Sequence, residues 1–139
     1  MGLVIDSSIA IAAERRGDTV ERLLKQIASL TGDQEIGISS VGLTELVHGI
    51  YRARAVDIRE RRASFIRELL LDIDVFAYDS ETAWLAGRID GEPRERGIAI
   101  PFPDLLIGAT ALQQGYSVFT VNTRHFQLIP GLKVIAHVP

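Results

Sequence analysis

The chain has 139 residues, 47% of them hydrophobic and 24% charged, with a net charge of −3 and no cysteine. This balance predicts one ordinary globular domain over residues 1–139 and excludes a disordered chain, while the absence of cysteine excludes disulfides, thiolate catalysis and zinc–thiolate sites. Because no apolar run approaches the roughly 18 residues that cross a bilayer, and the first residues lack the basic region of a signal peptide, we expect a cytoplasmic protein with no membrane partner.

Short β-rich runs alternate with longer helical patterns along the chain. In chain order we expect a strand at Leu3–Ile5, helices at Ser7–Arg16 and Thr19–Leu30, a strand at Ile36–Ser39, helices at Val41–Arg54 and Arg59–Leu71, a strand at Asp74–Tyr78, helices at Ser80–Arg96 and Asp104–Gln114, and strands at Ser117–Val121 and Lys133–His137. Strands separated by helices predict an α/β fold with a largely parallel sheet, because right-handed crossovers place helices on both faces. In such sheets, ligands bind beyond the carboxyl ends of the strands.

Four polar residues fall at that edge of the predicted sheet. Asp6 directly follows the first strand, and Asn122 follows the strand that ends at Val121. Glu45 lies one turn into the helix after the second strand, on a largely apolar stripe, and Asp104 begins the helix that leads to the fourth strand. Each residue has a simpler explanation on its own, because acids often cap helices or lie exposed on them and asparagine often forms turns.

The coincidence of all four residues favours one site. Three carboxylates that converge in a partly buried site repel each other and raise each other's pKa unless a cation lies between them. Ligand sets made of oxygen atoms alone select hard ions, so Mg²⁺ is the expected metal and Mn²⁺ its substitute. An ion of this kind lowers the pKa of a bound water and neutralises charge on a phosphoryl group. The pattern therefore predicts metal-dependent hydrolysis of phosphodiester bonds.

Four sequence runs occur in an order and at a spacing typical of one protein family: Val4-Ile-Asp-Ser-Ser-Ile9, Leu43-Thr-Glu-Leu-Val-His-Gly49, Pro103-Asp-Leu-Leu-Ile-Gly-Ala-Thr-Ala111 and Phe119-Thr-Val-Asn-Thr-Arg-His-Phe126. With them the chain resembles the PIN-domain ribonucleases, and more narrowly the VapC-type toxins of bacterial toxin–antitoxin pairs, over nearly its whole length. The resemblance implies an α/β/α sandwich with a five-stranded, mainly parallel sheet. It also implies an endoribonuclease that hydrolyses RNA with a metal-activated water.

The same resemblance implies roles for individual residues. Asp6, Glu45 and Asp104 match the acidic triad that holds Mg²⁺. Asn122 stands where many PIN domains carry a fourth acid and many VapC-type members carry asparagine, so it would ligate the metal through its carbonyl or position a water. Two hydroxyl positions that often support the site are matched by Ser7 and Thr120.

The implied partners are RNA and a cognate antitoxin protein. The antitoxin is expected to cover the active site and to offer a basic side chain to the acids. The apolar surface near Val41–Tyr51 is the predicted docking groove. We also expect a homodimer and a larger toxin–antitoxin complex.

Arginine dominates the basic residues, and six arginines fall between Arg52 and Arg67. Guanidinium groups bind phosphates through paired hydrogen bonds, so this cluster would seat an RNA backbone, with Arg59, Arg61 and Arg62 as the candidates. The alternative is a solvated helical face on which interleaved acids form salt bridges with the arginines. Both interpretations stay open at this point.

Two other phosphate-handling families also begin with a strand followed by an acid. A haloacid-dehalogenase phosphatase needs a second Asp two residues later, where this chain has Ser8, and a receiver domain needs paired acids after its first strand. The alternative that remains is a PIN-like domain that binds RNA or protein without cutting it. An intact set of Asp6, Glu45 and Asp104 argues against that alternative.

Histidines and aromatic residues add little to the predicted site. The three histidines form no credible metal or acid–base set, and we expect His48 to be packed and His125 and His137 to lie on the surface. Four aromatic residues would be able to stack on RNA bases, but their spacing is more typical of the core: Tyr51, Phe65, Trp84 and Phe102.

Overall fold

The computed structural model describes residues 2–92 and 99–137, with five strands and seven helices in these ranges. In chain order they are β1 Gly2–Ile5, α1 Ser7–Arg16, α2 Val20–Thr31, β2 Glu35–Ser39, α3 Ser40–Arg52, α4 Val56–Asp72, β3 Asp74–Phe76, α5 Ser80–Gly91, α6 Phe102–Gln114, β4 Ser117–Thr120, α7 Thr123–Phe126 and β5 Val134–Ala136. None of these helices is both long and apolar enough to cross a membrane.

All five strands form one parallel sheet with the order β3-β2-β1-β4-β5. β1 lies at the centre, where Val4 pairs with Gly37 of β2 on one side and with Val118 of β4 on the other. The chain builds outward from β1 to β2 and β3 and then crosses to β4, so the strand order reverses between β1 and β4. Parallel α/β sheets bind their ligands at such a reversal.

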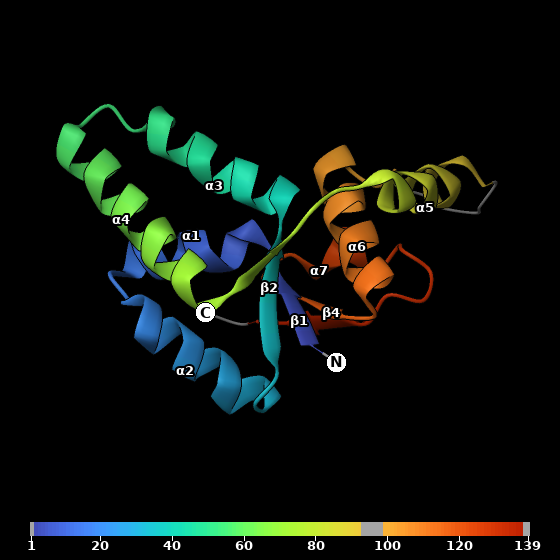
Figure 1. The fold of residues 1–139 in the computed structure, drawn as a ribbon, viewed down its shortest axis with the longest axis horizontal. Coiled ribbons are helices and arrows are strands. Elements are labelled where there is room, and N and C mark those ends of the chain that lie inside the picture. Colours follow the sequence, from blue (N-terminus) through green and yellow to red (C-terminus); the bar gives the residue numbers. More distant parts are fainter. Residues whose placement is uncertain (1, 93–98, 138–139) are drawn as a thin grey trace.

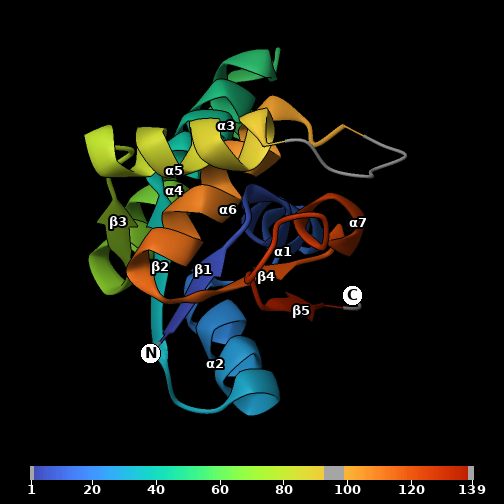
Figure 2. The same ribbon diagram turned by 90° about the vertical axis from the view of Figure 1, so that its right-hand side faces the viewer.

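Helices cover both faces of this sheet, as the two views in Figures 1 and 2 show. Leu3 and Ile5 belong to a core that packs against α1, α2 and α4. Val4, which lies between them in β1, belongs to a second core that packs against α5, α6 and α7. Successive side chains of a strand point to opposite faces, so the uninterrupted apolar run of β1 serves both cores. The predicted α/β/α sandwich with a five-stranded parallel sheet is confirmed.

The junctions between strands and helices place the beginnings of α1 and α3 at the carboxyl edge of the sheet. Ser39, the last residue of β2, caps α3, because its Oγ accepts hydrogen bonds from the backbone N–H groups of Val41 and Gly42. α1 follows β1 through the single residue Asp6 and ends at Gly17, whose φ of 79° is the left-handed conformation that glycine adopts most readily.

The observed elements differ from the predicted ones mainly at their ends. α6 begins at Phe102, so Pro103 is its second residue and Asp104 its third, whereas the sequence predicted a helix that starts at Asp104. α7 was not predicted, because a helix of four residues is too short to show hydrophobic periodicity. The predicted helix Ser80–Arg96 ends at Gly91, and its predicted residues 93–96 lie outside the described part of the chain.

Candidate active site

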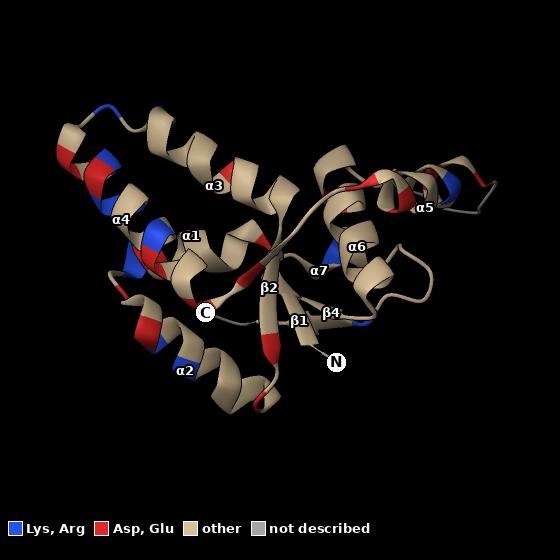
Figure 3. Cartoon of the chain, in the orientation of Figure 1, with Lys and Arg blue, Asp and Glu red and all other residues tan. Residues whose placement is uncertain are grey.

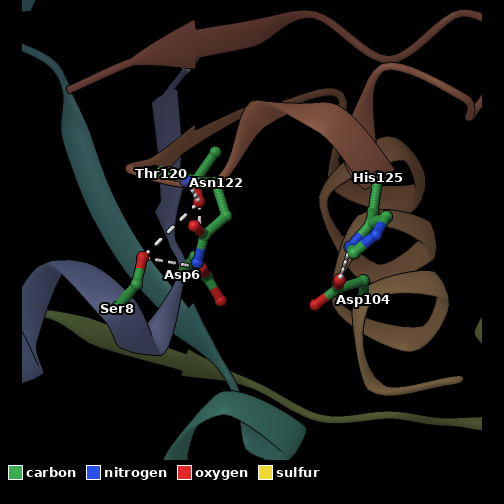
Figure 4. A network of polar contacts seen from close by, with 6 residues as sticks. All are labelled: Asp6, Ser8, Asp104, Thr120, Asn122 and His125. Carbon is green, nitrogen blue, oxygen red and sulfur yellow. Dashed lines mark hydrogen bonds and ion pairs between the residues drawn. The ribbon is translucent and has the colours of Figure 1, made fainter. Parts of the chain in front are cut away.

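Asp6 lies at the carboxyl end of β1 with only 5% of its surface exposed. Its Oδ2 accepts hydrogen bonds from Ser8 Oγ at 2.7 Å and from Thr120 Oγ1 at 2.9 Å (Figure 4). Although Asp6 is the N-cap residue of α1, its side chain makes no capping hydrogen bond. The explanation of this carboxylate as a simple helix cap therefore fails.

Glu45 lies in α3, half-buried beside the apolar residues Leu43 and Leu46. Ser7 Oγ, from the first turn of α1, donates a hydrogen bond to Glu45 Oε1 at 3.0 Å. Burial raises the pKa of the Glu45 carboxyl above its ordinary value, and the negative charges of Asp6 and Asp104 raise it further, whereas the hydrogen bond from Ser7 lowers it. Glu45 is thus held at the site by a hydroxyl group while its charged form is disfavoured.

Asp104 lies in the first turn of α6, on the far side of the site from Ser8 (Figure 4). Its Oδ2 is 2.9 Å from the imidazole Nδ1 of His125 in α7. Burial raises the pKa of the Asp104 carboxyl, and the nearby charge of Asp6 raises it further, while the hydrogen bond and the charge of His125 lower it. The favourable position of an acid at a helix start does not account for this contact with a second helix.

Asn122 follows β4 on the same side of the site as Asp6 (Figure 4). It is exposed, and its backbone N–H donates to Thr120 Oγ1 at 2.9 Å. Its side chain makes no capping hydrogen bond to α7. Thr120 is fully buried and connects the two residues, because its hydroxyl donates to Asp6 and accepts from Asn122.

Negative charge predominates at this site. The negative charges of Asp6 and Asp104 raise the pKa of Glu45, and that of Asp6 raises the pKa of Asp104. No lysine or arginine of residues 2–92 and 99–137 forms an ion pair with any of the three acids. Among the described residues, the His125 imidazole beside Asp104 opposes this negative charge, whereas Asp6 and Glu45 have no lysine or arginine partner.

The donor chemistry fits Mg²⁺ or Mn²⁺. Three carboxylates, with the amide of Asn122 at the same edge, offer hard oxygen ligands and no sulfur. As the side chains stand, no three Asp, Glu or His residues of the described ranges converge closely enough to hold an ion. Binding would therefore have to draw the acids together, and a divalent cation supplies the attraction for that.

Two residues of this site were missed by the sequence analysis. Ser8 was considered only as a departure from another family, yet its hydroxyl donates to Asp6. His125 was expected on the surface, but it is only partly exposed and contacts Asp104. The sequence offered a signal for Ser8, because hydroxyl groups two residues from a buried acid often hydrogen-bond to it, but none for His125.

The other predictions for histidines and aromatic residues need correction. His48 is exposed rather than packed, and His137 is buried against the ring of Phe119 rather than on the surface. Of the four aromatic residues expected in the core, only Phe65 is buried, whereas three are exposed: Tyr51, Trp84 and Phe102.

The arginines proposed to bind RNA already have partners within the chain. Arg61 Nε donates to Glu14 Oε1 at 2.9 Å, and Arg62 Nη1 donates to the carbonyl oxygen of Gly49 at 2.7 Å. Arg59 also donates to a carbonyl oxygen at the end of α3. Blue and red segments alternate along α4 in Figure 3. These contacts tie α4 to α1 and α3. Among the described residues, the ion pairs of Arg61 and Arg62 are with Glu14 of α1 and not with acids interleaved along α4, so the arginines serve packing between helices in a way that neither interpretation described.

A pocket of about 390 Å³ lies between α1, α3 and α4, with Glu45 in its wall. Apolar side chains line much of it: Ala10, Ile11, Leu46, Ile58, Phe65 and Ile66. Charged side chains complete the lining: Glu14, Arg15, Arg52 and Arg62. The pocket includes the α3 surface that the sequence analysis predicted as a docking groove.

Comparison with known proteins identifies the class. The family model described as PIN domain matches residues 3–132, and the chain belongs to this family. Ribonuclease VapC1 of Rickettsia felis is 33% identical over 135 residues, which cover 97% of this chain and 96% of that protein. The tRNA(fMet)-specific endonuclease VapC of Salmonella typhimurium is 31% identical over 97 residues, 70% of this chain and 71% of that protein. The predicted resemblance to VapC-type members is confirmed.

Solved structures of toxin–antitoxin complexes share the fold. VapBC2 from Rickettsia felis, bound to a DNA fragment from its promoter, superposes with a TM-score of 0.84 at 22% identity, covering 99% of this chain and 100% of that chain. DNA-bound VapBC from Salmonella typhimurium gives a TM-score of 0.79 at 24% identity, with 98% of each chain covered. At these identities the likeness establishes the fold alone.

Proposed function

We propose that this protein is an endoribonuclease that uses Mg²⁺, with Mn²⁺ as a substitute, and acts as the toxin of a bacterial toxin–antitoxin pair. One observation carries the proposal: three mutually repelling carboxylates lie at the strand-order reversal, and no lysine or arginine of the described residues pairs with them. Such an arrangement fits a site completed by a divalent cation. The relatives' names, ribonuclease and tRNA(fMet)-specific endonuclease, support RNA as the substrate class.

In this proposal each residue has a defined task. Asp6, Glu45 and Asp104 hold the metal through carboxylate oxygens, and Asn122 ligates through its carbonyl or orients a water. When bound, the metal lowers the pKa of a water molecule and neutralises charge on the phosphoryl group. The chain supplies orientation through hydroxyl groups that donate to the acids and thereby aim their free oxygens: Ser7, Ser8 and Thr120.

We further propose that an antitoxin segment occupies the pocket between α1, α3 and α4. An amphipathic segment fits its apolar lining and charged rim. Because Glu45 is part of the wall, a basic side chain of that segment would reach the acids and block the metal. The structural neighbours are described as VapBC assemblies, which supports a larger complex, and we include a homodimer and a cytoplasmic location in the proposal. Isolation from the native host as a lone, freely active monomer would contradict it.

A second function, binding of RNA or protein without cleavage, is favoured by one observation. As the side chains stand, the described acids do not converge on one point. A binding module would tolerate that spacing, whereas a nuclease must close it around a metal. Cleavage assays separate the two functions directly.

The decisive experiment is brief expression of the wild type beside Asp6→Asn, followed by sequencing of RNA 5′ ends. We expect new, recurring ends with the wild type and none with Asp6→Asn. Purified wild type should produce the same ends on isolated RNA with Mg²⁺ and lose them in EDTA. Equal cleavage by wild type and Asp6→Asn would refute the proposed site, and absence of cleavage by both would favour the binding module.

RNA-backbone contacts by Arg59, Arg61 and Arg62 remain a prediction with a separate test. Replacing all three with Gln removes their charge while keeping a hydrogen-bond donor. If they bind single-stranded RNA, the salt dependence of affinity should flatten by roughly 0.7 unit for each lost phosphate contact. An unchanged slope would assign them to the contacts within the chain that tie α4 to α1 and α3.

A further inference from the structure

His125 and Asp104 come from different helices but form one polar contact, drawn in Figure 4. Nδ1 of the imidazole lies 2.9 Å from Asp104 Oδ2. An ionised carboxylate only accepts hydrogen bonds, so when Asp104 is ionised the proton of this bond is on Nδ1 of His125. The bond engages Oδ2 and leaves Oδ1 of Asp104 as the oxygen available to a ligand.

Packing next to this pair keeps its two helices together. Phe126, adjacent to His125, is fully buried in the core that α6 also lines. Gly108 of α6 lies so close to the segment after α7 that a Cβ atom there would collide with the side chain of Ile129 and come within 3.5 Å of Phe126. The absence of a side chain at Gly108 thus leaves room for Ile129, so α6 packs closely against α7 and the segment that follows it.

The segment that carries His125 also reaches Asp6. Thr120, at the end of β4, donates its hydroxyl proton to Asp6, and Asn122 donates its backbone N–H to Thr120. Within six residues, the chain from Thr120 to His125 therefore contacts Asp6, which follows β1, and Asp104 of α6. Movement of this segment would change the orientation of both carboxylates.

Every acid of the triad then has a side-chain donor from another element. Glu45 receives its hydrogen bond from α1, and Asp6 receives one from β4. Asp104 receives its hydrogen bond from α7. Hydrogen bonds to metal-binding carboxylates fix which oxygen faces the ion, and loss of such a partner typically costs roughly 10- to 100-fold in metal affinity or activity.

We propose that His125 is a positioning residue, whose Nδ1–H holds the Asp104 carboxylate with Oδ1 turned toward the metal. The inference rests on the proposed function, because it assigns His125 a task at that same site. His125 does not ligate the metal in this arrangement. It acts through Asp104.

The test measures Mn²⁺ affinity by calorimetry for wild type, His125→Leu and His125→Asn. His125→Leu removes the donor, and we expect Mn²⁺ binding to weaken by roughly 10-fold or more. The amide N–H₂ of His125→Asn lies near the position of Nδ1 and donates in the same direction, so affinity should return to within a few-fold of the wild type. His48→Leu, at an exposed histidine, is the matched control and should bind Mn²⁺ as the wild type does.

A second measurement keeps the inference testable if His125→Leu does not fold. Long-range ¹⁵N–¹H spectra of wild-type histidines at mildly alkaline pH report which ring nitrogen of the neutral imidazole carries the proton. A proton on Nδ1 of His125 supports the inference, and a proton on Nε2 would overturn it. Wild-type affinity in His125→Leu would also overturn it while leaving the nuclease proposal intact, whereas absence of Mn²⁺ binding by the wild type would refute both.

Discussion

Acidic side chains gather at both ends of the same sheet, in different surroundings. The carboxyl-end acids are Asp6, Glu45 and Asp104. The amino-end acids precede or begin β2 and β3 and line a pocket of about 310 Å³: Asp33, Glu35, Asp72 and Asp74. By number alone, the amino end would be the stronger candidate for a cation site.

Burial separates the two groups. All four amino-end acids are exposed to solvent, where water and salt screen their mutual repulsion. The carboxyl-end acids are buried or half-buried, each accepts a hydrogen bond from a fixed side chain, and burial raises the pKa of Glu45 and Asp104. A site is therefore indicated by carboxylates that the fold desolvates and orients, and not by the number of acids near one another.

The largest expected difference between the two ends concerns catalysis. Asp104→Asn removes a charge that the proposed metal site needs and hardly changes the shape of the side chain. We expect RNA cleavage at limiting Mg²⁺ to fall by orders of magnitude, with loss of toxicity in cells, while the free energy of unfolding changes by about 1 kcal/mol or less, because Asn is tolerated at helix starts. Asp74→Asn is the matched control at the amino end and should cleave as the wild type does.

Full cleavage by folded Asp104→Asn would show that this carboxyl-end acid is not needed for catalysis. Loss of cleavage in Asp74→Asn would show that an exposed amino-end acid matters for catalysis as much as a half-buried carboxyl-end acid. Circular dichroism of each variant separates loss of chemistry from loss of fold.

Metal binding gives the next largest difference. A ligand that binds only the folded state stabilises it by about 2.7 kcal/mol at a hundred times its Kd, so Mn²⁺ at millimolar concentration should raise the melting temperature of the wild type by several degrees. The double variant Asp6→Ala/Asp104→Ala should lose this increase. The amino-end double variant Asp72→Ala/Asp74→Ala should keep it, and an equal loss in both double variants would show that Mn²⁺ binds nonspecifically to acidic surfaces.

The sequence predicted where the carboxyl-end acids lie in the fold because each position follows from local chain geometry, while their role as a metal site stays a prediction. An apolar run followed by one acid predicts a central strand that ends in a buried carboxylate, and Leu3–Ile5 with Asp6 has this form. The limits of α1 were predicted as observed, because Gly17 adopts the left-handed conformation that ends helices. Local order along the chain thus sufficed for the fold and for the positions of the acids.

The contacts between elements were not predictable in the same way. His125 reaches Asp104 because α6 and α7 pack against each other in one core, and no local pattern reports the distance between two helices. His48 shows the converse error, since helical spacing placed it on the stripe of Glu45, yet α3 leaves it exposed. Hydrophobic periodicity predicts which face of a helix is buried, but not how far that burial extends around it.

The pH dependence of stability gives a smaller difference. For Glu45 and Asp104 the folded-state pKa is raised, so the folded protein binds more protons than the unfolded chain between about pH 4 and the raised values. Their contribution to stability is therefore present at low pH and is lost as the pH rises through the folded pKa. In EDTA, Glu45→Gln and Asp104→Asn should each reduce this loss in urea unfolding measured across that range.

Asp79, which caps α5, is a control whose pKa is shifted in the opposite direction. Hydrogen bonds from the Thr82 backbone and hydroxyl lower the pKa of this exposed acid. Its contribution should be present above about pH 4 and lost as the pH falls, so Asp79→Asn should change the profile in the other direction. Identical changes in Asp79→Asn and Glu45→Gln would show that burial does not distinguish the carboxyl-end acids.

The smallest effect is expected at the amino end, where Tyr116 donates its hydroxyl proton to Glu35. This bond raises the pKa of the Tyr116 hydroxyl, so whatever stability it provides is present at neutral pH and is lost as the pH rises through the folded pKa, above about 10. Tyr116→Phe keeps the edge-on ring contact with Phe76 and removes only the hydroxyl. We expect a slight loss of stability at neutral pH that disappears in alkaline solution, with Mn²⁺ affinity and RNA cleavage unchanged. The hydrogen bond between Tyr116 and Glu35 is exposed and lies at the opposite end of the sheet from Asp6. Impaired cleavage in Tyr116→Phe would therefore mean that the two ends are coupled through the strands. In that case the acids of the two ends would not differ in their importance for catalysis.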